Sequence, residues 1–349
     1  MNLKQFYKRG LHSAKKGNYE AAIDDFDRIL HLNPADAKAY NNRGLVYYYM
    51  KDYQRAIADL SQALDLNPHL FEAYLNRGNA WRHLGENEKA IEDLNSALEN
   101  NPDSHAIYNN RGLVLANLGN YEEAIQDYDR ALSINSQNYK TYYNRGRAYY
   151  LLGEKEAATE NFNETLRLNP RYIKAYINRG LSCHQLGDNT QAIADYNTAL
   201  GIDPQNIYAY YNRGCVRYKL KQIQLAIEDF DKVVELDPSY VKAYLNRGLA
   251  LYKLGDITAA NKDFYHVMCI NAEAYFYYQA QRCTPDINSY FKEAPRMELN
   301  NAVEYYNTTL NTMNTISTSF SSTSLNSVWN QEDLDHRESI ICEGEFIND

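Results

Sequence analysis

Apolar and polar positions alternate along residues 3–274 in a pattern that repeats every 34 residues without an insertion. We number each repeat from position 1, and repeat 1 begins at Leu3. Mostly apolar residues at positions 4 and 11 share one face of a helix, because they are seven residues apart. Positions 20, 24 and 27 form the apolar stripe of a second helix. The pattern therefore predicts eight repeats of two helices each.

Six columns of identical or similar residues support this interpretation. Glycine at position 8 and alanine at position 20 leave room for two helix backbones to approach closely, while large side chains at positions 4 and 24 fill the space beside them. Glycine occupies position 15 in six repeats, which suits a tight turn between helices. Proline occupies position 32 in six repeats, where it ends the second helix and favours the start of the next. The position-8 glycines are Gly10, Gly44, Gly78, Gly112, Gly146, Gly180, Gly214 and Gly248.

These columns resemble the tetratricopeptide repeat (TPR) family over residues 3–274. The resemblance implies an all-α fold, a right-handed superhelical solenoid of antiparallel helix pairs. In that family the first helices line a concave groove, which usually binds peptides or partner proteins.

Beyond residue 274 the strict register is lost. Residues 275–313 are expected to form a degenerate ninth repeat that caps the stack, since terminal repeats are atypical. Residues 314–329 are rich in Ser, Thr and Asn, and residues 332–349 are acidic, so we expect residues 314–349 to be disordered.

Position 7 is arginine in all eight repeats, and position 23 is aspartate in all but repeat 5, which has Asn161. One interpretation makes the arginines a column of anion receptors. The favoured alternative is a structural Arg–Asp pair between the two helices, because a buried charge must be paired. With Asn161 as its neutral partner, Arg145 is the arginine that we expect to be most available to a ligand.

Position 6 is asparagine in repeats 2 to 8, and it is expected to face the groove. An amide side chain both donates and accepts, so a row of amides could hold an extended peptide backbone without reading its sequence. The row resembles the asparagine ladder in the superhelix of the protein O-linked N-acetylglucosaminyltransferase. The alternative is local hydrogen bonding between adjacent first helices. The row consists of Asn42, Asn76, Asn110, Asn144, Asn178, Asn212 and Asn246.

Other groove positions carry basic and aromatic residues, which favour an acidic extended segment as the ligand. The alternative is solvated lysines and tyrosines that shield helix contacts. A clamp for the carboxylate of a chaperone tail matches only at Asn79, Asn110 and Lys140 and fails at Leu75 and Asn144. The candidate groove residues are Lys38, Arg82, Lys140, Arg147, Lys174, Lys242, Tyr143, Tyr150, Tyr211 and Tyr218.

Composition narrows the class of protein. The net charge of −9 argues against a general nucleic-acid binder, although residues 330–349 alone hold seven acids and one arginine. Five scattered cysteines favour a reducing compartment. The sequence contains no apolar run of the kind that a signal peptide or a membrane-spanning helix requires. We therefore expect a cytoplasmic protein. No motif for catalysis, metal binding or a cofactor is present, so we expect neither an enzyme nor a cofactor.

The sequence thus predicts a non-enzymatic scaffold that binds an extended peptide or partner protein in a groove. Two alternatives remain open: an assembly or chaperone-like factor, and a purely structural solenoid without a groove ligand. A further hypothesis is that the acidic C-terminal tail folds back into the groove and competes with the partner.

Overall fold

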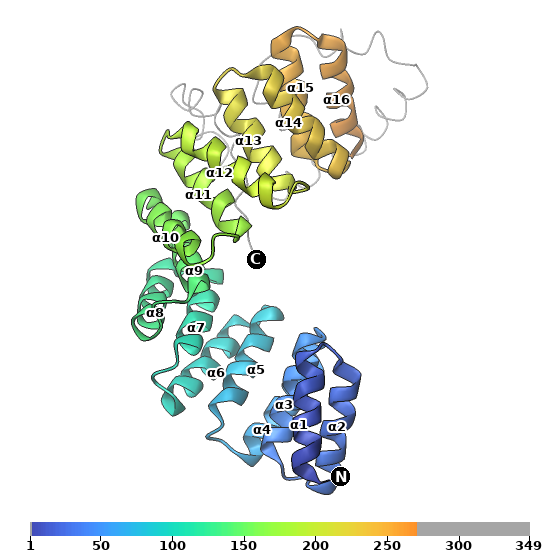
Figure 1. Cartoon of the computed structure of the whole chain (residues 1–349), viewed down its shortest axis with the longest axis vertical. Coiled ribbons are helices and arrows are strands. Elements are labelled where there is room, and N and C mark those ends of the chain that lie inside the picture. Colours follow the sequence, from blue (N-terminus) through green and yellow to red (C-terminus); the bar gives the residue numbers. More distant parts are fainter. Residues whose placement is uncertain (1, 271–349) are drawn as a thin grey trace, which may run out of the picture. The chain divides into compact units, whose positions relative to one another are not determined.

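The computed structural model describes residues 2–270, which form sixteen α-helices and no strand (Figure 1). Consecutive helices pair and are joined by short turns, so the members of each pair run antiparallel. The helices are α1 (Leu3–Lys15), α2 (Tyr19–Leu32), α3 (Ala37–Tyr49), α4 (Tyr53–Leu66), α5 (Phe71–His83), α6 (Asn87–Asn100), α7 (His105–Asn117), α8 (Tyr121–Ile134), α9 (Tyr139–Leu152), α10 (Lys155–Leu168), α11 (Ile173–Gln185), α12 (Asn189–Ile202), α13 (Ile207–Lys219), α14 (Ile223–Leu236), α15 (Val241–Leu254) and α16 (Ile257–Ile270).

The described residues divide into two compact bodies, each of which is treated by itself. The N-terminal body comprises residues 2–170 with helices α1–α10, and the C-terminal body comprises residues 171–270 with helices α11–α16. The expected ninth repeat (275–313) and tail (314–349) lie outside the described residues.

The turn inside each pair depends on a left-handed residue at position 15. The six glycines there have φ between 79° and 99°, a region that glycine enters at no steric cost. Repeats 2 and 7 have lysine instead, yet Lys51 (φ 62°) and Lys221 (φ 61°) adopt the same conformation. The packing of the helix pair therefore sets the turn, and glycine only makes it easier.

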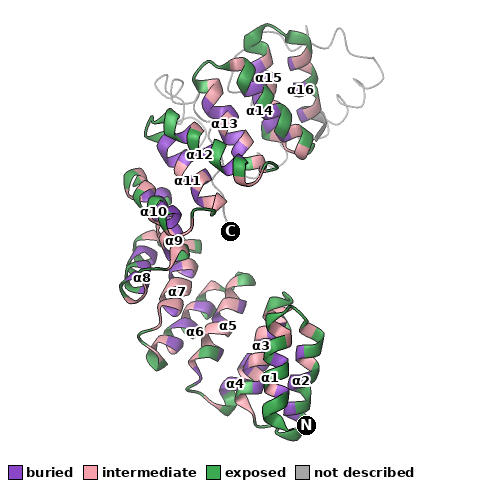
Figure 2. Cartoon of the chain, in the orientation of Figure 1, coloured by how far each residue is buried: buried purple, intermediate pink, exposed green. Residues whose placement is uncertain are grey.

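The core of each pair follows the predicted stripe of the second helix. Every alanine at position 20 is fully buried, and the side chains at positions 24 and 27 are at most 9% exposed (Figure 2). The position-8 glycines sit directly against position 24: a Cβ on Gly112 would lie 2.7 Å from Tyr128 Cε1. Position 8 is therefore always glycine, because any side chain there would collide with the residue at position 24.

A second packing surface joins each repeat to the one before it, and the sequence pattern did not reveal it. Positions 3 and 10 of the first helix are almost completely buried from repeat 2 onward, as at Ala39 and Val46, which pack into the core of repeat 1. In repeat 1 these positions are the exposed Gln5 and His12. By contrast, positions 4 and 11, which the pattern placed on the apolar face, are mostly only half-buried.

The arginine column forms structural ion pairs, which confirms the favoured alternative. Arg77 donates from Nε and Nη2 to the two carboxylate oxygens of Asp93, at 2.8 and 2.7 Å. Its Nη1 donates to Ser61 Oγ of the preceding repeat at 2.9 Å, and its guanidinium lies 5.8 Å from the centre of the Tyr74 ring. The same pairing is found in Arg9–Asp25, Arg43–Asp59, Arg111–Asp127, Arg179–Asp195, Arg213–Asp229 and Arg247–Asp263.

Repeat 5 corrects one expectation. Arg145 is not available to a ligand, because Nε donates to Asn161 Oδ1 at 2.8 Å and Nη1 pairs with Asp129 of the preceding repeat at 2.5 Å. Asp129 of the neighbouring helix pair thus supplies the carboxylate that Asn161 lacks. A comparison of positions within one repeat could not show this contact.

We expect Asp93→Ala to lower the free energy of unfolding by about 3 kcal/mol, since it leaves the half-buried Arg77 charge without its main partner. Urea denaturation measures this. Asp103, which is 80% exposed and lies 3.4 Å from Arg130, provides the control: Asp103→Ala should change stability by less than about 0.5 kcal/mol. An equal loss of unfolding free energy in the two variants would show that the Arg77–Asp93 pair does not stabilise the fold.

Gly112→Ala should destabilise by about 1–3 kcal/mol, because the added methyl group collides with Tyr128 and the core is already full. Gly201 is a matched helical glycine with nothing within 4 Å of its Cβ position. Gly201→Ala should therefore stabilise, by about 0.5–1 kcal/mol, through helix propensity alone. Thermal melts of the two variants should shift in opposite directions; shifts of the same sign would contradict the close-packing account.

Candidate functional site

The first helices of successive pairs lie against one another inside each body. Contacts join α1, α3, α5, α7 and α9 in order in the N-terminal body, and α11, α13 and α15 in the C-terminal body. The second helices make no comparable contact with each other, so each body curves toward its first helices. We call the surface formed by positions 2, 5, 6, 9, 12 and 13 of these helices the first-helix face.

Charge is strongly segregated between the two kinds of helix. The eight first helices together contain twenty Lys and Arg residues and a single acid, Glu72. The second helices are acidic, with four acids in each of α2, α6 and α8. The position-7 arginines pair with aspartates of the second helices, and Arg217 pairs with Asp229 as well. The net charge of −9 therefore conceals a cationic surface.

In the N-terminal body the first three amides of the asparagine row, Asn42, Asn76 and Asn110, are half-buried. Asn76 Nδ2 donates to Asn41 Oδ1 of the preceding first helix at 3.0 Å. Asn144 is buried, and its Nδ2 donates in the same way to Asn109 Oδ1 at 3.1 Å. The local hydrogen bonding that we considered as an alternative is thus present at Asn76 and Asn144. The acceptors are position-5 amides, which were not among the predicted site residues.

In the C-terminal body the row is buried: Asn178 and Asn212 are fully covered and Asn246 is 1% exposed. Asn246 Nδ2 donates to Tyr211 Oη at 3.0 Å, again across 35 residues. Its Oδ1 is buried without a hydrogen-bond partner among the described residues. Ligand binding by the row stays a prediction in both bodies.

The predicted basic and aromatic residues fall into three groups, which are exposed, half-buried and buried. Lys38, Lys140 and Lys242 are exposed, while Lys174, Arg82, Arg147 and Tyr218 are half-buried. Tyr143 and Tyr211 are each 1% exposed and pack on Phe162 and Phe230, so they belong to the core and not to the surface that we expected. Tyr150 is also buried, with the Lys155 ammonium 3.7 Å from the centre of its ring.

An aromatic cluster that the sequence analysis only partly anticipated lies at the edge of repeats 2 and 3. The His83 imidazole stacks on Tyr53 with ring centres 5.0 Å apart, and Tyr48 lies edge-on to Tyr53 at 5.7 Å. Nε2 of His83 lies 3.0 Å from Tyr48 Oη and 3.2 Å from Arg82 Nη2. Burial, together with Arg82 and Lys51, lowers the pKa of His83 below its ordinary value. The histidine is therefore neutral at pH 7, and the cluster offers aromatic rings beside a cation.

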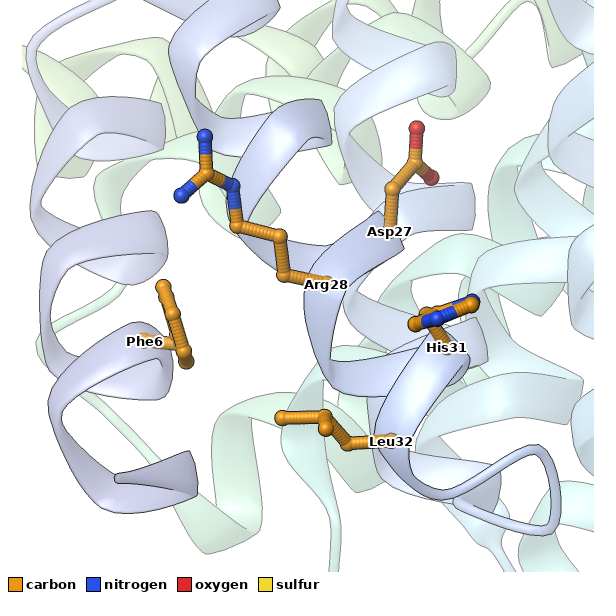
Figure 3. Close-up of a pocket in the computed structure, with 5 residues that line it drawn as sticks. All are labelled: Phe6, Asp27, Arg28, His31 and Leu32. Atoms are coloured by element: carbon orange, nitrogen blue, oxygen red, sulfur yellow. The ribbon is translucent and has the colours of Figure 1, made fainter. Parts of the chain in front are cut away.

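A cavity of about 420 Å³ lies between α1 and the second half of α2 (Figure 3). It is lined by Phe6, Asp27, Arg28, His31 and Leu32. Two of its polar residues are engaged, since Arg28 lies 5.8 Å from the centre of the Phe6 ring and Asp27 pairs with Arg43. The cavity contains none of the predicted groove residues.

Within residues 2–270, no group of three or more His, Cys, Asp or Glu side chains is placed to hold a metal ion. None of the helices in this part of the chain combines the length and the apolar composition that a bilayer crossing needs.

Stacked helix pairs with a first-helix face in each body define the chain as a helical-repeat protein, a class that serves as protein-interaction scaffolds. It belongs to the tetratricopeptide repeat family. A model described as TPR repeat matches residues 13–51, 78–119 and 180–221. A second model, described as Tetratricopeptide repeat, matches residues 37–70, 105–138, 139–172 and 207–240.

Solved structures support the fold. A tetratricopeptide repeat protein from Parabacteroides merdae is 22% identical with a TM-score of 0.55, over 71% of this chain and 98% of its own. The pilF protein of Pseudomonas aeruginosa is 20% identical with a TM-score of 0.54, over 61% and 97%. The Cut9–Hcn1 hetero-tetramer of the APC/C contains a chain that is 15% identical with a TM-score of 0.55, over 78% and 52%. No curated protein matches the sequence.

The imidazole of His83 should titrate with a pKa below its ordinary value of 6.5. Replacing Arg82 by methionine should raise that pKa, because a neighbouring positive charge is lost. Histidine-selective NMR titration of the wild type and of Arg82→Met measures both values. An ordinary pKa for His83, unchanged by Arg82→Met, would contradict the described packing.

Proposed function

We propose that this protein is a non-enzymatic scaffold whose first-helix face binds an extended acidic peptide, or an acidic extended segment of a partner protein. The observation that carries the proposal is the segregation of charge: twenty cations against one acid on the first helices of an otherwise acidic chain. Complementary charge speeds association and selects among partners.

The N-terminal body is the part of the chain that we assign to an external partner. Asn42, Asn76 and Asn110 are half-buried there and are reachable from solvent, flanked by the exposed Lys38 and Lys140. Amides on neighbouring first helices lie about 8–10 Å apart, so each can exchange hydrogen bonds with roughly every third peptide group of an extended segment. Lysines at position 2 then favour acidic side chains, and the cluster around Tyr48 and Arg82 adds aromatic surface.

The site of action that we propose is the cytoplasm. Cys183 and Cys215 are buried free thiols, and thiols of this kind persist in a reducing compartment.

The proposal is tested with short fluorescent peptides of strongly negative, neutral and strongly positive net charge, by anisotropy against the full chain. The acidic peptides should bind, and added salt should weaken them because the contacts are solvent-exposed. Asn76→Ala/Asn110→Ala should reduce their affinity about tenfold, the equivalent of 1.4 kcal/mol. Lys38→Glu/Lys140→Glu should reduce it at least as much.

Asn18 and Asn120 supply the matched control, because both are exposed asparagines at the start of second helices and neither side chain caps its helix. Asn18→Ala/Asn120→Ala should leave binding unchanged. Equal binding of peptides of all charges, or no effect of the face variants in a folded chain, would refute the proposal. Binding of a single-stranded RNA as tightly as the acidic peptides would point to a nucleic-acid site instead.

A further inference from the structure

Five aromatic rings form an unbroken series along the turns of repeats 1 to 3 in the N-terminal body. Tyr19 stacks on Tyr49 with ring centres 6.3 Å apart, and Tyr53 stacks on His83 at 5.0 Å. Tyr48 lies edge-on between the two pairs, 5.8 Å from Tyr49 and 5.7 Å from Tyr53. We call these five rings the aromatic ladder. They come from the starts of α2 and α4 and the ends of α3 and α5, so the ladder follows the direction in which the repeats stack.

The ladder is accessible to a ligand. Tyr49 is 55% exposed and His83 is also exposed, while the other three rings are half-buried. Their sequence neighbours Met50 and Leu84 are 38% and 37% exposed. Exposed apolar and aromatic side chains that lie together mark interaction surfaces more often than single ones do.

The repeat fold does not require rings at these positions. At the next repeat boundary the corresponding residues are the amides Asn87 and Asn117, and at the one after that they are Tyr121 and Leu151. The helices of these repeats pack in the same order as those of repeats 1 to 3. Helix packing therefore does not account for the ladder.

The polar groups beside the rings are mainly hydrogen-bond donors. Nε2 of the neutral His83 accepts from Arg82 Nη2 at 3.2 Å, because a guanidinium can only donate. The proton of the imidazole is therefore on Nδ1, which makes no hydrogen bond within residues 2–270. Lys51 is exposed and lies close enough to help lower the pKa of His83.

The carboxylates of the two turns are already occupied. Asp52 accepts from the backbone N–H and from Nε of Arg55, at 3.0 and 2.5 Å. Glu86 pairs with Lys89 at 3.1 Å. The ladder therefore offers aromatic surface and donors, which suits a ligand that brings acceptors and no donors.

We propose that the aromatic ladder binds a proline-rich segment of a partner protein. Each proline contributes a carbonyl acceptor and no N–H. In the polyproline II conformation these carbonyls have no internal partner, and the segment repeats every three residues, which is about 9 Å. Neighbouring packed helices are about 8–10 Å apart, so prolines one turn apart match the two stacked pairs.

This inference goes beyond the proposed function. A proline-rich segment carries no charge, and its binding surface includes Tyr19 and Tyr53, which the binding of an acidic peptide does not use. The two ligands are therefore distinguished by their response to salt and to different variants.

The test measures the anisotropy of a capped, fluorescent ten-proline peptide against the full chain, with five Gly-Ser dipeptides as the uncharged control peptide. The proline peptide should bind and the Gly-Ser peptide should not, because only the first is already in the extended polyproline conformation. Added salt should leave the affinity unchanged, since the ligand has no charge to screen.

Tyr49→Ala/His83→Ala removes one exposed ring from each stacked pair and should weaken proline-peptide binding at least about tenfold. Tyr49→Phe keeps the ring and should bind as the wild type does. The matched control is Tyr208→Ala/His69→Ala, an exposed tyrosine and an exposed histidine outside the ladder, and it should keep binding.

Absence of proline-peptide binding by the folded wild type would overturn the inference, and so would equal binding by Tyr49→Ala/His83→Ala. An oligouridine that binds more tightly than the proline peptide, and is lost in the same variant, would assign the ladder to nucleic-acid bases instead. Failure of the proposed function is seen separately, in the response of acidic peptides to Asn76→Ala/Asn110→Ala.

Discussion

The structure depends on one repeated interaction, the fork of the position-7 arginine, which in six repeats joins three helices. Two nitrogens of the guanidinium bind the aspartate of the same repeat, as in Arg77–Asp93, and the third reaches back to the preceding repeat, as in Arg77–Ser61. A planar fork accepts only a narrow range of positions for its partners. It therefore fixes the register of a first helix against its own second helix and against the previous one.

This fork contributes less to the free energy of folding than to the specific alignment of the helices. Burial raises the pKa of the Asp93 carboxyl above its ordinary value even beside Arg77, while the bond to Asp93 raises the pKa of Arg77 in spite of burial. Removal from water therefore outweighs the attraction for the carboxylate alone. The favourable energy comes instead from the alanines, glycines and large apolar residues that pack between the helices. The ion pairs remove eight arginines from possible ligand contacts and leave the lysines to determine the charge of the first-helix face.

Much of the fold was predictable because its determinants recur at one period. The pairing of helices, the buried positions 20, 24 and 27, and the Arg–Asp pair all follow from columns that can be read in the sequence. The features that the sequence did not predict depend on contacts between neighbouring repeats. They are the buried positions 3 and 10, the pairing of Arg145 with Asp129, and the hydrogen bonds between side-chain amides 35 residues apart. Lys51 and Lys221 show a turn conformation that the residue type would not predict.

The candidate site was harder to predict from the sequence than the fold. Position within a repeat says which helix face a residue shares but not whether larger neighbours cover it. Tyr143 and Tyr211 show this, because both rings are core residues. Asn42 and Asn246 occupy the same column, yet one is half-buried and the other is covered. The stack of Tyr53 and His83 joins two repeats, and the stacked pair Tyr19–Tyr49 occupies the same positions one repeat earlier. The residue types at these positions vary, so the sequence columns did not predict either stack.

The central claim is that the cationic first-helix face, and not the acidic second helices, is the ligand-binding surface. A crystal structure of the full chain with a bound acidic peptide tests it most directly. The account predicts an extended peptide whose backbone lies within hydrogen-bonding distance of Asn42, Asn76 and Asn110. A peptide bound to the second helices, or in the cavity beside Phe6, would contradict it.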